Sequence, residues 1–224
     1  MTTSLSDAGL QFADTNTITS LSAMPTTGTY TIGNLILNKN AATNAKLLGW
    51  KRLTAGSSHV LNTDWLEITS GITVTTPQTT TSGTTKDFTG IPVWAKRITV
   101  IFTGVSLSGT NDLLVQLGTS GGFVSTGYIS TGIRVTNAAS SGGGSSTSGM
   151  VISSSAAANT VSGHMILTTD GSNNWVSSHT AKSATTLVSF GGGDIALGGT
   201  LTQVRITPSG ADTFDAGSIN ITYE

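Results

Sequence analysis

Apolar and polar residues alternate with a period of two over much of the C-terminal part of the chain. In residues 97–103, for example, Ile98, Val100 and Phe102 alternate with mostly polar residues. Strict alternation of this kind is typical of a strand that buries one face. Similar runs, separated by turn residues, recur at the spacing expected of a sandwich. Residues 88–224 are therefore predicted to form an antiparallel β-sandwich, jelly-roll-like, of about nine or ten strands.

The preceding part of the chain carries shorter apolar runs. Residues 25–68 contain three such runs with turn residues between them, which predicts a small three-stranded module. Tyr30, Trp50 and Trp65 are large side chains for so short a segment, so they are candidates for its core or for contacts with a sugar ring. Residues 69–87 are rich in threonine and contain one proline, which predicts a linker or an edge strand.

Two stretches show no strand pattern. Residues 1–24 have isolated apolar side chains in a polar background, and they cannot build a core alone. We therefore expect another subunit or another protein to hold them, with Leu10 and Phe12 as candidate attachment residues. Residues 137–149, NAASSGGGSSTSG, lack large apolar side chains and predict a flexible loop. No stretch of the chain is predicted to form a helix, so the expected fold class is all-β.

Composition narrows the classes of partner. Charged residues make up 9% of the chain and the net charge is −1, so neither a nucleic acid nor an anionic membrane surface is an expected partner. There is no cysteine, which excludes disulfides, thiolate nucleophiles and cysteine-bound zinc. The hydrophobic content of 37% is low for a compact monomer and favours burial against sister chains.

The sequence shows no pattern typical of a signal peptide or a membrane span. The N-terminus has no basic stretch followed by an apolar one, and no segment approaches the roughly 20 apolar residues of a membrane span. The sequence thus predicts synthesis in the cytoplasm without membrane insertion.

One motif is similar to the Gly-Asp-Ser-Gly-Gly stretch around the nucleophile of serine proteases. It is QLGTSGGF, residues 116–123, but Thr119 stands where that family has aspartate. A triad also needs a histidine base, and the only upstream histidine is His59, within the small module. We therefore predict a hairpin turn at this position and no nucleophile.

Metal ligands are equally weakly indicated. His59, His164 and His179 are not spaced two or four residues apart, so no local pair exists to start a metal site. His164 and His179 could face each other across a hairpin that turns at Asp170 and Gly171, a dipeptide that tolerates the positive φ of such turns. Surface or strand-face histidines are the favoured interpretation, and no metal or cofactor is predicted.

The carboxylates near the C-terminus suggest turns. Asp212 and Asp215 flank Phe214 just before the alternating run of residues 218–223. Aspartate hydrogen-bonds its own backbone in turns, so both are expected to place Phe214 against the core and start the last strand. No pair of carboxylates is placed by sequence in a shared cleft, as a glycosidase would need, so the protein is not expected to be an enzyme.

Exposed rings are the best candidates for ligand contact. Tyr128 and Trp175 lie beside predicted turns and are the leading candidates for contacts with a glycan or receptor. Trp94 follows a proline at a strand entrance and is a third candidate, either packed or at a subunit contact.

Two of these regions resemble parts of bacteriophage proteins. Residues 25–68, PTTGTYTIGNLILNKNAATNAKLLGWKRLTAGSSHVLNTDWLEI, resemble the small accessory module of phage tail fibres and tailspikes, with Asn34 after Gly33 where aspartate is usual. Residues 91–128 and 190–224 are similar to a domain that closes many phage fibre proteins.

The N-terminus adds a third resemblance. Residues 6–20, SDAGLQFADTNTITS, resemble a fibre junction usually written Leu-Gln-Phe-x-Asp-Gly-Thr, with Thr15 and Asn16 in place of Gly and Thr. Together the three resemblances imply a virion structural protein, a short homotrimeric tail fibre or fibre tip. Residues 1–24 would join another virion protein, and the terminal domain would attach to host surface polysaccharide.

Two other functions are compatible with the same features. A capsid decoration (cement) or head-fibre protein would use the β domains to stabilise the capsid without a ligand. A polysaccharide depolymerase is disfavoured, because a parallel β-helix with paired carboxylates is not predicted.

Overall fold

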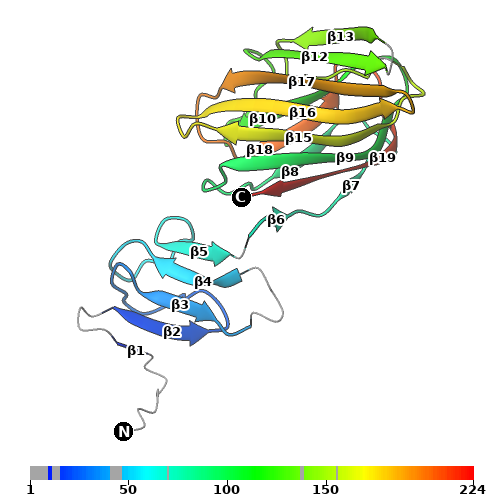
Figure 1. Ribbon diagram of the computed structural model, residues 1–224. Helices are drawn as coiled ribbons and strands as arrows, with labels where there is room; N and C mark the ends of the chain where they lie inside the picture. Colours follow the sequence, from blue (N-terminus) through cyan, green and yellow to red (C-terminus); the bar gives the residue numbers. More distant parts are fainter. Residues whose placement is uncertain (1–9, 12–15, 41–46, 70, 137–138, 155) are drawn as a thin grey trace. The chain divides into compact units, whose positions relative to one another are not determined.

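The fold is all-β, as the sequence predicts. The computed structural model describes residues 10–11, 16–40, 47–69, 71–136, 139–154 and 156–224, and for residues 10, 11, 140 and 141 it describes the backbone only. All the regular secondary structure in these ranges consists of β-strands (Figure 1). No helix in the described part of the chain has the length and apolarity needed to span a membrane. The chain divides into an N-terminal unit, residues 1–71, and a C-terminal unit, residues 72–224.

The N-terminal unit contains one five-stranded sheet in the order β1-β2-β3-β4-β5. Its strands are β1 (Leu10–Gln11), β2 (Thr17–Leu21), β3 (Leu35–Asn38), β4 (Leu47–Arg52) and β5 (Trp65–Thr69). All neighbours are antiparallel except β2 and β3, which are parallel. The intervening residues 22–34 form the long connection that a parallel pair requires.

Residues 25–68 contribute three strands, as predicted, and the sheet gains two more from the preceding residues. Strands β3, β4 and β5 correspond to the three apolar runs, whereas β1 and β2 come from residues 1–24, predicted as an attachment segment. Ladder hydrogen bonds are made by the backbone, so a strand such as β2 can join a sheet without a long apolar run. Of the two candidate attachment residues, Leu10 pairs through its backbone with Ile18, and Phe12 lies outside the described residues.

The core of the N-terminal unit is aromatic. Trp65 is fully buried and Trp50 is 4% exposed, and both pack with Ile36. Tyr30 is half-buried and meets Trp65 edge-on, with ring centres 4.9 Å apart. The structure thus places the three aromatic candidates of this module in or against its core, the first of their two predicted roles, and leaves Trp50 and Trp65 almost no exposed surface.

A buried arginine organises the loop between β4 and β5. Arg52 is fully buried, and its guanidinium donates to the carbonyl oxygens of Ser58 (2.6 Å) and Gly56 (3.0 Å). The guanidinium carbon lies 5.0 Å from the centre of the Trp65 ring, a cation–π distance. Arg52 therefore ties two carbonyl groups of the loop to the core of the unit.

A carboxylate completes the same loop. Asp64 accepts hydrogen bonds from the hydroxyl groups of Thr54 and Ser58 and from the backbone N–H of Val60. These donors stabilise the ionised form, and they lower the pKa of Asp64 to about 2. His59 belongs to this network as well, because its Nδ1 accepts a 3.2 Å hydrogen bond from Trp65 Nε1.

The C-terminal unit is built from two sheets. The larger has nine strands in the order β13-β12-β17-β16-β15-β9-β19-β6, with β7 also paired to β19. These strands are β6 (Thr73–Val74), β7 (Gln78–Thr79), β9 (Arg97–Leu107), β12 (Ile129–Thr136), β13 (Ser140–Ser146), β15 (Val161–Thr169), β16 (Asn174–Ala184), β17 (Leu187–Ala196) and β19 (Phe214–Tyr223). Its neighbouring strands are antiparallel throughout.

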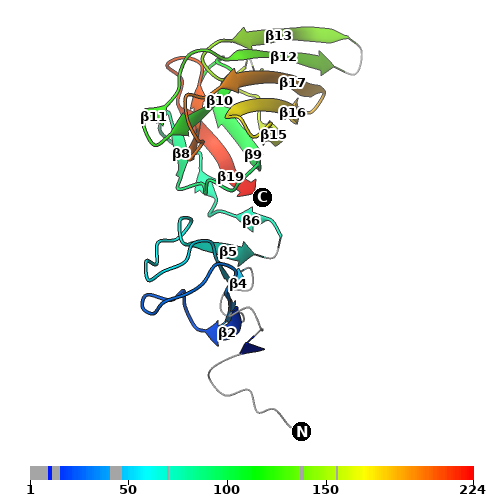
Figure 2. The ribbon, with the colours of Figure 1, turned by 90° about the vertical axis from the view of Figure 1, so that its left-hand side faces the viewer.

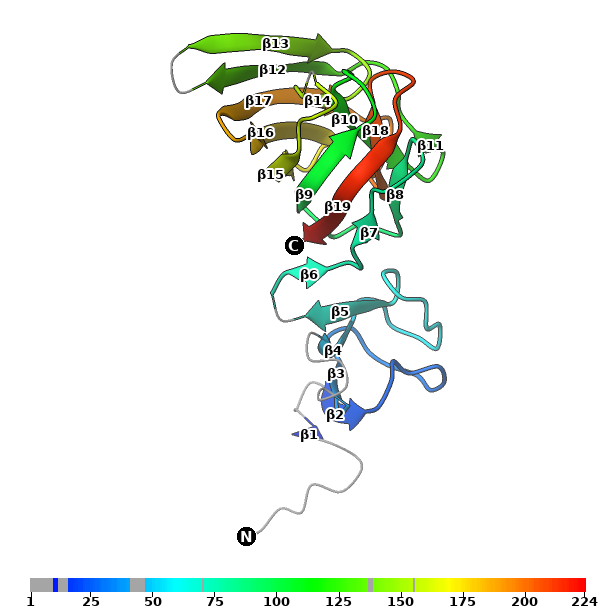
Figure 3. The same ribbon diagram turned by 90° about the vertical axis from the view of Figure 1, so that its right-hand side faces the viewer.

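The smaller sheet has five strands and lies behind the larger one in Figure 1. Its order is β11-β10-β18-β8, and β14 pairs with β10. These strands are β8 (Lys86–Thr89), β10 (Leu113–Thr119), β11 (Gly122–Phe123), β14 (Met150–Ile152) and β18 (Gln203–Pro208). Figures 2 and 3 show how the nine-stranded sheet curls around it.

One continuous core joins the two sheets. The alternating residues Ile98, Val100 and Phe102 of β9 are at most 2% exposed, and they pack in one cluster with residues such as Val115 and Ile206 of the smaller sheet. This is the packing predicted from the alternation in the sequence, so the expected sandwich architecture is confirmed.

The threonine-rich range 69–87 contributes strands to the C-terminal unit. Val74 pairs with Thr222, and Thr79 pairs with Ser218, both on β19. Asp87 pairs with Arg205, whose guanidinium also binds its carboxylate through two 2.7 Å hydrogen bonds. The range therefore forms short edge strands, one of its two predicted states, and does not act as a free linker.

The glycine- and serine-rich range 137–149 is also different from the prediction. Ser140–Ser146 forms strand β13, which pairs with β12, while residues 137 and 138 lie outside the described residues. A Cβ atom at Gly143 would lie 2.4 Å from the carbonyl oxygen of Gly132, so only glycine allows this approach. The flexible-loop prediction is wrong here because backbone pairing replaces apolar burial.

Both predicted hairpin turns are present. The motif at residues 116–123 forms the β10–β11 hairpin, in which Thr119 pairs with Gly122. The Asp170-Gly171 turn joins β15 to β16, and Gly171 has a φ of 95°, which glycine adopts readily.

Candidate functional site

The nine-stranded sheet of the C-terminal unit has one face on the core and one facing away from it. We call the second the outer face, and Figure 1 looks onto this sheet. On β17, Ser189 and Ile195 are buried on the core side, whereas Val188, Phe190 and Asp194 are exposed on the outer face. The alternation of the strand thus presents an aromatic ring, 44% exposed, in the middle of a sheet.

Strand register aligns Phe190 with side chains of four neighbouring strands. It pairs with Ile133 on β12 and with Thr180 on β16. Thr180 pairs with His164 on β15, which pairs with Ile101 on β9. We call Ile133, Phe190, Thr180, His164 and Ile101 the Phe190 row. With neighbouring strands roughly 4.8 Å apart, the row is about 19 Å long.

A shallow depression lies at one end of the row. Its volume is about 500 Å³. It is lined by Arg97, Thr99, Ile101, Phe102, Gly163, His164 and Ile166. Ile101 and Ile166 supply apolar surface, and Arg97, Thr99 and His164 supply polar groups, a combination that suits small-molecule binding.

The outer face has little net charge. Arg97 is paired with Glu224, with Nη1 3.0 Å from Oε1, and both side chains are about half exposed. Lys182 and Asp194 are the other charged residues of strands β16 and β17 on this face. Opposite charges therefore balance on the surface around the row, and a charged ligand gains no strong attraction there.

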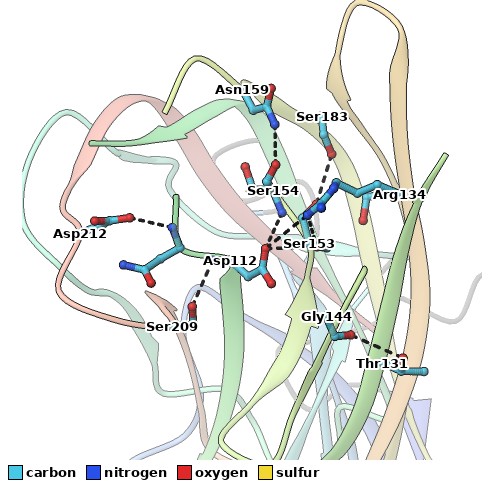
Figure 4. Close-up of polar contacts among 12 residues, drawn as sticks. Asp112, Thr131, Arg134, Gly144, Ser153, Ser154, Asn159, Ser183, Ser209 and Asp212 are labelled. Atoms are coloured by element: carbon cyan, nitrogen blue, oxygen red, sulfur yellow. Dashed lines mark hydrogen bonds and ion pairs between the residues drawn. The ribbon is translucent and has the colours of Figure 1, made fainter. Parts of the chain in front are cut away.

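A polar cluster on the core side holds β12 in place (Figure 4). Arg134 of β12 donates to Ser153 Oγ and lies 3.9 Å from Asp112 Oδ1. Asp112 Oδ1 also accepts from the backbone N–H of Ser154 at 2.7 Å and from Ser153 Oγ at 3.2 Å. The cluster ties β12 to the chain before β10 and after β14, and so it supports the Ile133 end of the row.

Gly144 of β13 packs against the carboxylate of Asp112. A Cβ atom at Gly144 would lie 2.6 Å from Asp112 Oδ2, so a larger residue at this position would have to displace the carboxylate. On the other side, the amide of Asn159 donates to the carbonyl oxygen of Ser154. These hydrogen bonds connect β12 with the segments around Asp112 and Ser154, so the cluster acts as a structural tie.

His179 lies on the core side of β16, next to Thr180. It is 4% exposed, and its Nε2 lies 3.2 Å from Ser189 Oγ. Its Nδ1 is the one buried side-chain nitrogen or oxygen without a hydrogen-bond partner in the described part of the chain. Burial lowers the pKa of His179 to about 4, so the ring is neutral near neutral pH.

The two histidines of this hairpin do not face each other. His179 pairs with Met165 and points to the core, whereas His164 pairs with Thr180 and is exposed on the outer face. The idea of a shared site is wrong because the offset of one residue in register places them on opposite faces. The described residues hold no group of three or more side chains that could bind a metal ion.

Two of the rings expected at the surface are buried. Tyr128 is 1% exposed, and its hydroxyl accepts from the backbone N–H of Leu117 (2.7 Å) and donates to the carbonyl of Val124 (3.0 Å). Burial raises the pKa of Tyr128 to about 12. Trp175 is 3% exposed within the core. Both predictions of exposed contact residues are wrong, because position beside a turn does not decide which face a side chain takes.

The third candidate is intermediate. Trp94 is half-buried against the core, and its ring centre lies 5.6 Å from that of Tyr223. The exposed ring that sequence reasoning missed is Phe190. Its strand has apolar residues in both phases, Leu187, Val188 and Phe190, so alternation did not reveal which side faces solvent.

The two C-terminal carboxylates have different places. Asp212 precedes β19 and accepts from the backbone N–H of Asn111 at 2.8 Å, so it binds a distant loop and not the backbone of its own turn. Asp215 is within β19 and accepts from Ser106 Oγ, so it is a strand residue and its predicted turn role is wrong. Phe214 between them is 1% exposed, as expected of a core residue.

No protein-family model, no curated protein and no solved structure matches this chain.

Proposed function

We propose that the chain is a phage virion structural protein, a short trimeric tail fibre or fibre tip that attaches to the host cell surface. In this role the C-terminal unit binds surface polysaccharide without catalysis, and residues 1–24 join another virion protein. The resemblance of residues 25–68, 91–128 and 190–224 to phage fibre proteins supports this proposal.

The structural observation that carries the proposal is the exposure of Phe190 on an outer face of balanced charge. An aromatic ring among hydroxyl groups offers both the apolar surface and the hydrogen-bonding groups that a sugar ring contacts. Nucleic acid is not an expected partner, because the net charge of −1 gives no attraction for phosphate.

The proposal is tested with the purified full-length protein on an array of bacterial surface polysaccharides and in adsorption assays with host cells. We expect binding to one class of polysaccharide, and competition between the protein and the virion for host cells. Absence of binding, together with adsorption by virions that lack this protein, would refute the proposal. Light scattering should give the mass of three chains, and a monomer at micromolar concentration would contradict the trimeric state.

A capsid decoration or head-fibre role remains the second candidate, because apolar side chains other than Phe190 are exposed on the same face. Ile129 is 72% exposed and Val176 is 55% exposed. Exposed apolar side chains on one face are a common feature of protein contacts. A reconstruction of the virion separates the two roles: density for this chain on the capsid lattice would support decoration, and density at the tail would support attachment.

A further inference from the structure

We infer that the Phe190 row is the binding track for a neutral, linear saccharide that lies across strands β17, β16, β15 and β9. This inference rests on the proposed function and adds the ligand class and the residues that contact it. One hexose unit in an extended chain is about as long as the roughly 4.8 Å spacing between strands. The track therefore accommodates about four units, one for each of these strands.

Phe190 provides the stacking platform. Among the described residues it is the only phenylalanine, tyrosine or tryptophan whose side chain is largely exposed. Of its two neighbours on the outer face along β17, Val188 and Gly192, the glycine has no side chain to shield that side of the ring. An exposed ring at the centre of a sheet, with open space beside it, can receive the apolar face of a pyranose.

Thr180 and His164 provide the polar contacts. They follow Phe190 on the next two strands, and both are exposed on the outer face. No hydrogen bond from the rest of the described structure occupies either side chain. A threonine hydroxyl can donate and accept, and a neutral imidazole can do both through its two nitrogens, which suits the hydroxyl groups of a sugar.

The end of the track is a shallow depression with two apolar side chains. Ile101 and Ile166 line the depression of about 500 Å³ beside His164. The saccharide would end there, over the apolar side chains and within reach of the Thr99 hydroxyl. A terminal unit buried in a depression gains more apolar contact than one lying on a flat sheet.

The charge distribution favours a neutral ligand. The row itself contains no carboxylate and no lysine or arginine. Arg97, at the far side of the depression, is already paired with Glu224 at 3.0 Å. An acidic saccharide would have to compete with this carboxylate for the guanidinium and would be repelled by it, whereas a neutral one would leave the pair intact.

The test uses the full-length protein and three alanine variants of exposed residues. Phe190→Ala and His164→Ala remove members of the track. Val176→Ala is the matched control, because Val176 is exposed on the same face of β16 but lies four residues from Thr180, roughly 13 Å away. Thermal unfolding followed by circular dichroism verifies that all three variants fold.

The probes are linear neutral oligosaccharides of one to six hexose units with glucose, galactose or mannose configuration, and uronic-acid chains of the same lengths. We expect affinity in titration calorimetry to rise with length up to about four units and then to level. Phe190→Ala should lose more than tenfold in affinity and His164→Ala several-fold, while Val176→Ala stays within twofold. NMR shifts on binding should be largest for residues of the row.

The outcomes separate this inference from the proposed function. If the wild-type protein binds neither the polysaccharide array nor host cells, both fail. If it binds and Phe190→Ala behaves like Val176→Ala, the attachment role stands and the track is refuted. Binding of uronic-acid chains alone would also refute it, and so would a change in oligomeric mass caused by Phe190→Ala, which would identify the row as a contact between copies.

Discussion

The Cα atom of Gly144 packs so closely on Asp112 that a Cβ atom there would lie 2.6 Å from the carboxylate Oδ2. This contact joins strand β13, which has no large apolar side chain, to the polar cluster that supports β12. The stability of this edge of the sheet therefore depends on the small size of glycine and on backbone pairing.

We expect Gly144→Ala to destabilise the C-terminal unit by about 1–3 kcal/mol, because the methyl group must displace a carboxylate that is held by several hydrogen bonds. The matched control is Gly198→Ala, where a Cβ atom would have no neighbour within 4 Å. Urea unfolding of both variants gives the comparison. Equal stabilities would show that β13 accommodates the added methyl group without a loss in the free energy of unfolding.

Asp112→Ala should have a comparable effect for an electrostatic reason. It leaves Arg134, which is 9% exposed, without its carboxylate and leaves the Ser154 N–H without an acceptor. A loss on the order of 2 kcal/mol in the free energy of unfolding is expected. Asp194→Ala, on the exposed outer face, serves as the control and should change stability by less than about 0.5 kcal/mol.

Stability should fall in mildly acidic solution because of His179. Its pKa is lowered from an ordinary value of 6.5 to about 4 in the folded state, so the unfolded state binds the proton first as pH falls. The stability contributed by the neutral ring is complete above pH 6.5 and is lost as pH falls towards 4, by about 3 kcal/mol in total. His179→Gln should flatten this part of the profile of unfolding free energy against pH, and an unchanged slope would exclude His179 as its source.

Tyr128→Phe should lower stability without altering ligand binding. The variant removes the acceptor of the Leu117 N–H and the donor to Val124, both at a buried position, at a cost of about 1–3 kcal/mol. Denaturant unfolding measures the loss. The variant is expected to bind saccharide with the affinity of the wild type. A large drop in the affinity of the folded variant would show that Tyr128 contributes to binding.

The N-terminal unit should lose stability at a lower pH than the C-terminal unit. Hydrogen bonds from Thr54, Ser58 and Val60 lower the pKa of Asp64 from 3.8 to about 2, so its contribution is present above pH 3.8 and is lost as pH falls through 2. The indole signals of Trp50 and Trp65 in NMR spectra report this unit. In Asp64→Asn these signals should change with pH less between 4 and 2 than in the wild type.

Much of the architecture could be predicted from local pattern. The alternation of Ile98, Val100 and Phe102 specified a strand with one buried face, and the Asp170-Gly171 pair specified a turn. Strands without apolar residues could not be found this way: β13 is made of serine and glycine, and its place depends on the backbone of β12. The sequence likewise did not decide whether the residues of the short strands β6 and β7 form strands, because they pair with β19, which is distant in the sequence.

The candidate site was harder to predict than the fold. Tyr128, Trp175 and Phe190 are all aromatic residues in or beside strands, and sequence distinguishes them poorly. Which of them faces solvent depends on the register between strands and on which side of the sheet the smaller sheet covers. The row from Phe190 to Ile101 likewise joins residues up to 89 positions apart that only pairing brings into line.

By itself the amino-acid sequence determined an all-β chain, a low charge and most of the strands with a buried face, because these follow from residue type and from a period of two. Only the tertiary structure decided which aromatic ring is exposed, that His164 and His179 lie on opposite faces, and that a polar tie of Arg134 and Asp112 supports the sheet. These features depend on contacts between distant segments, and a one-residue change of register would reverse every one of the faces involved.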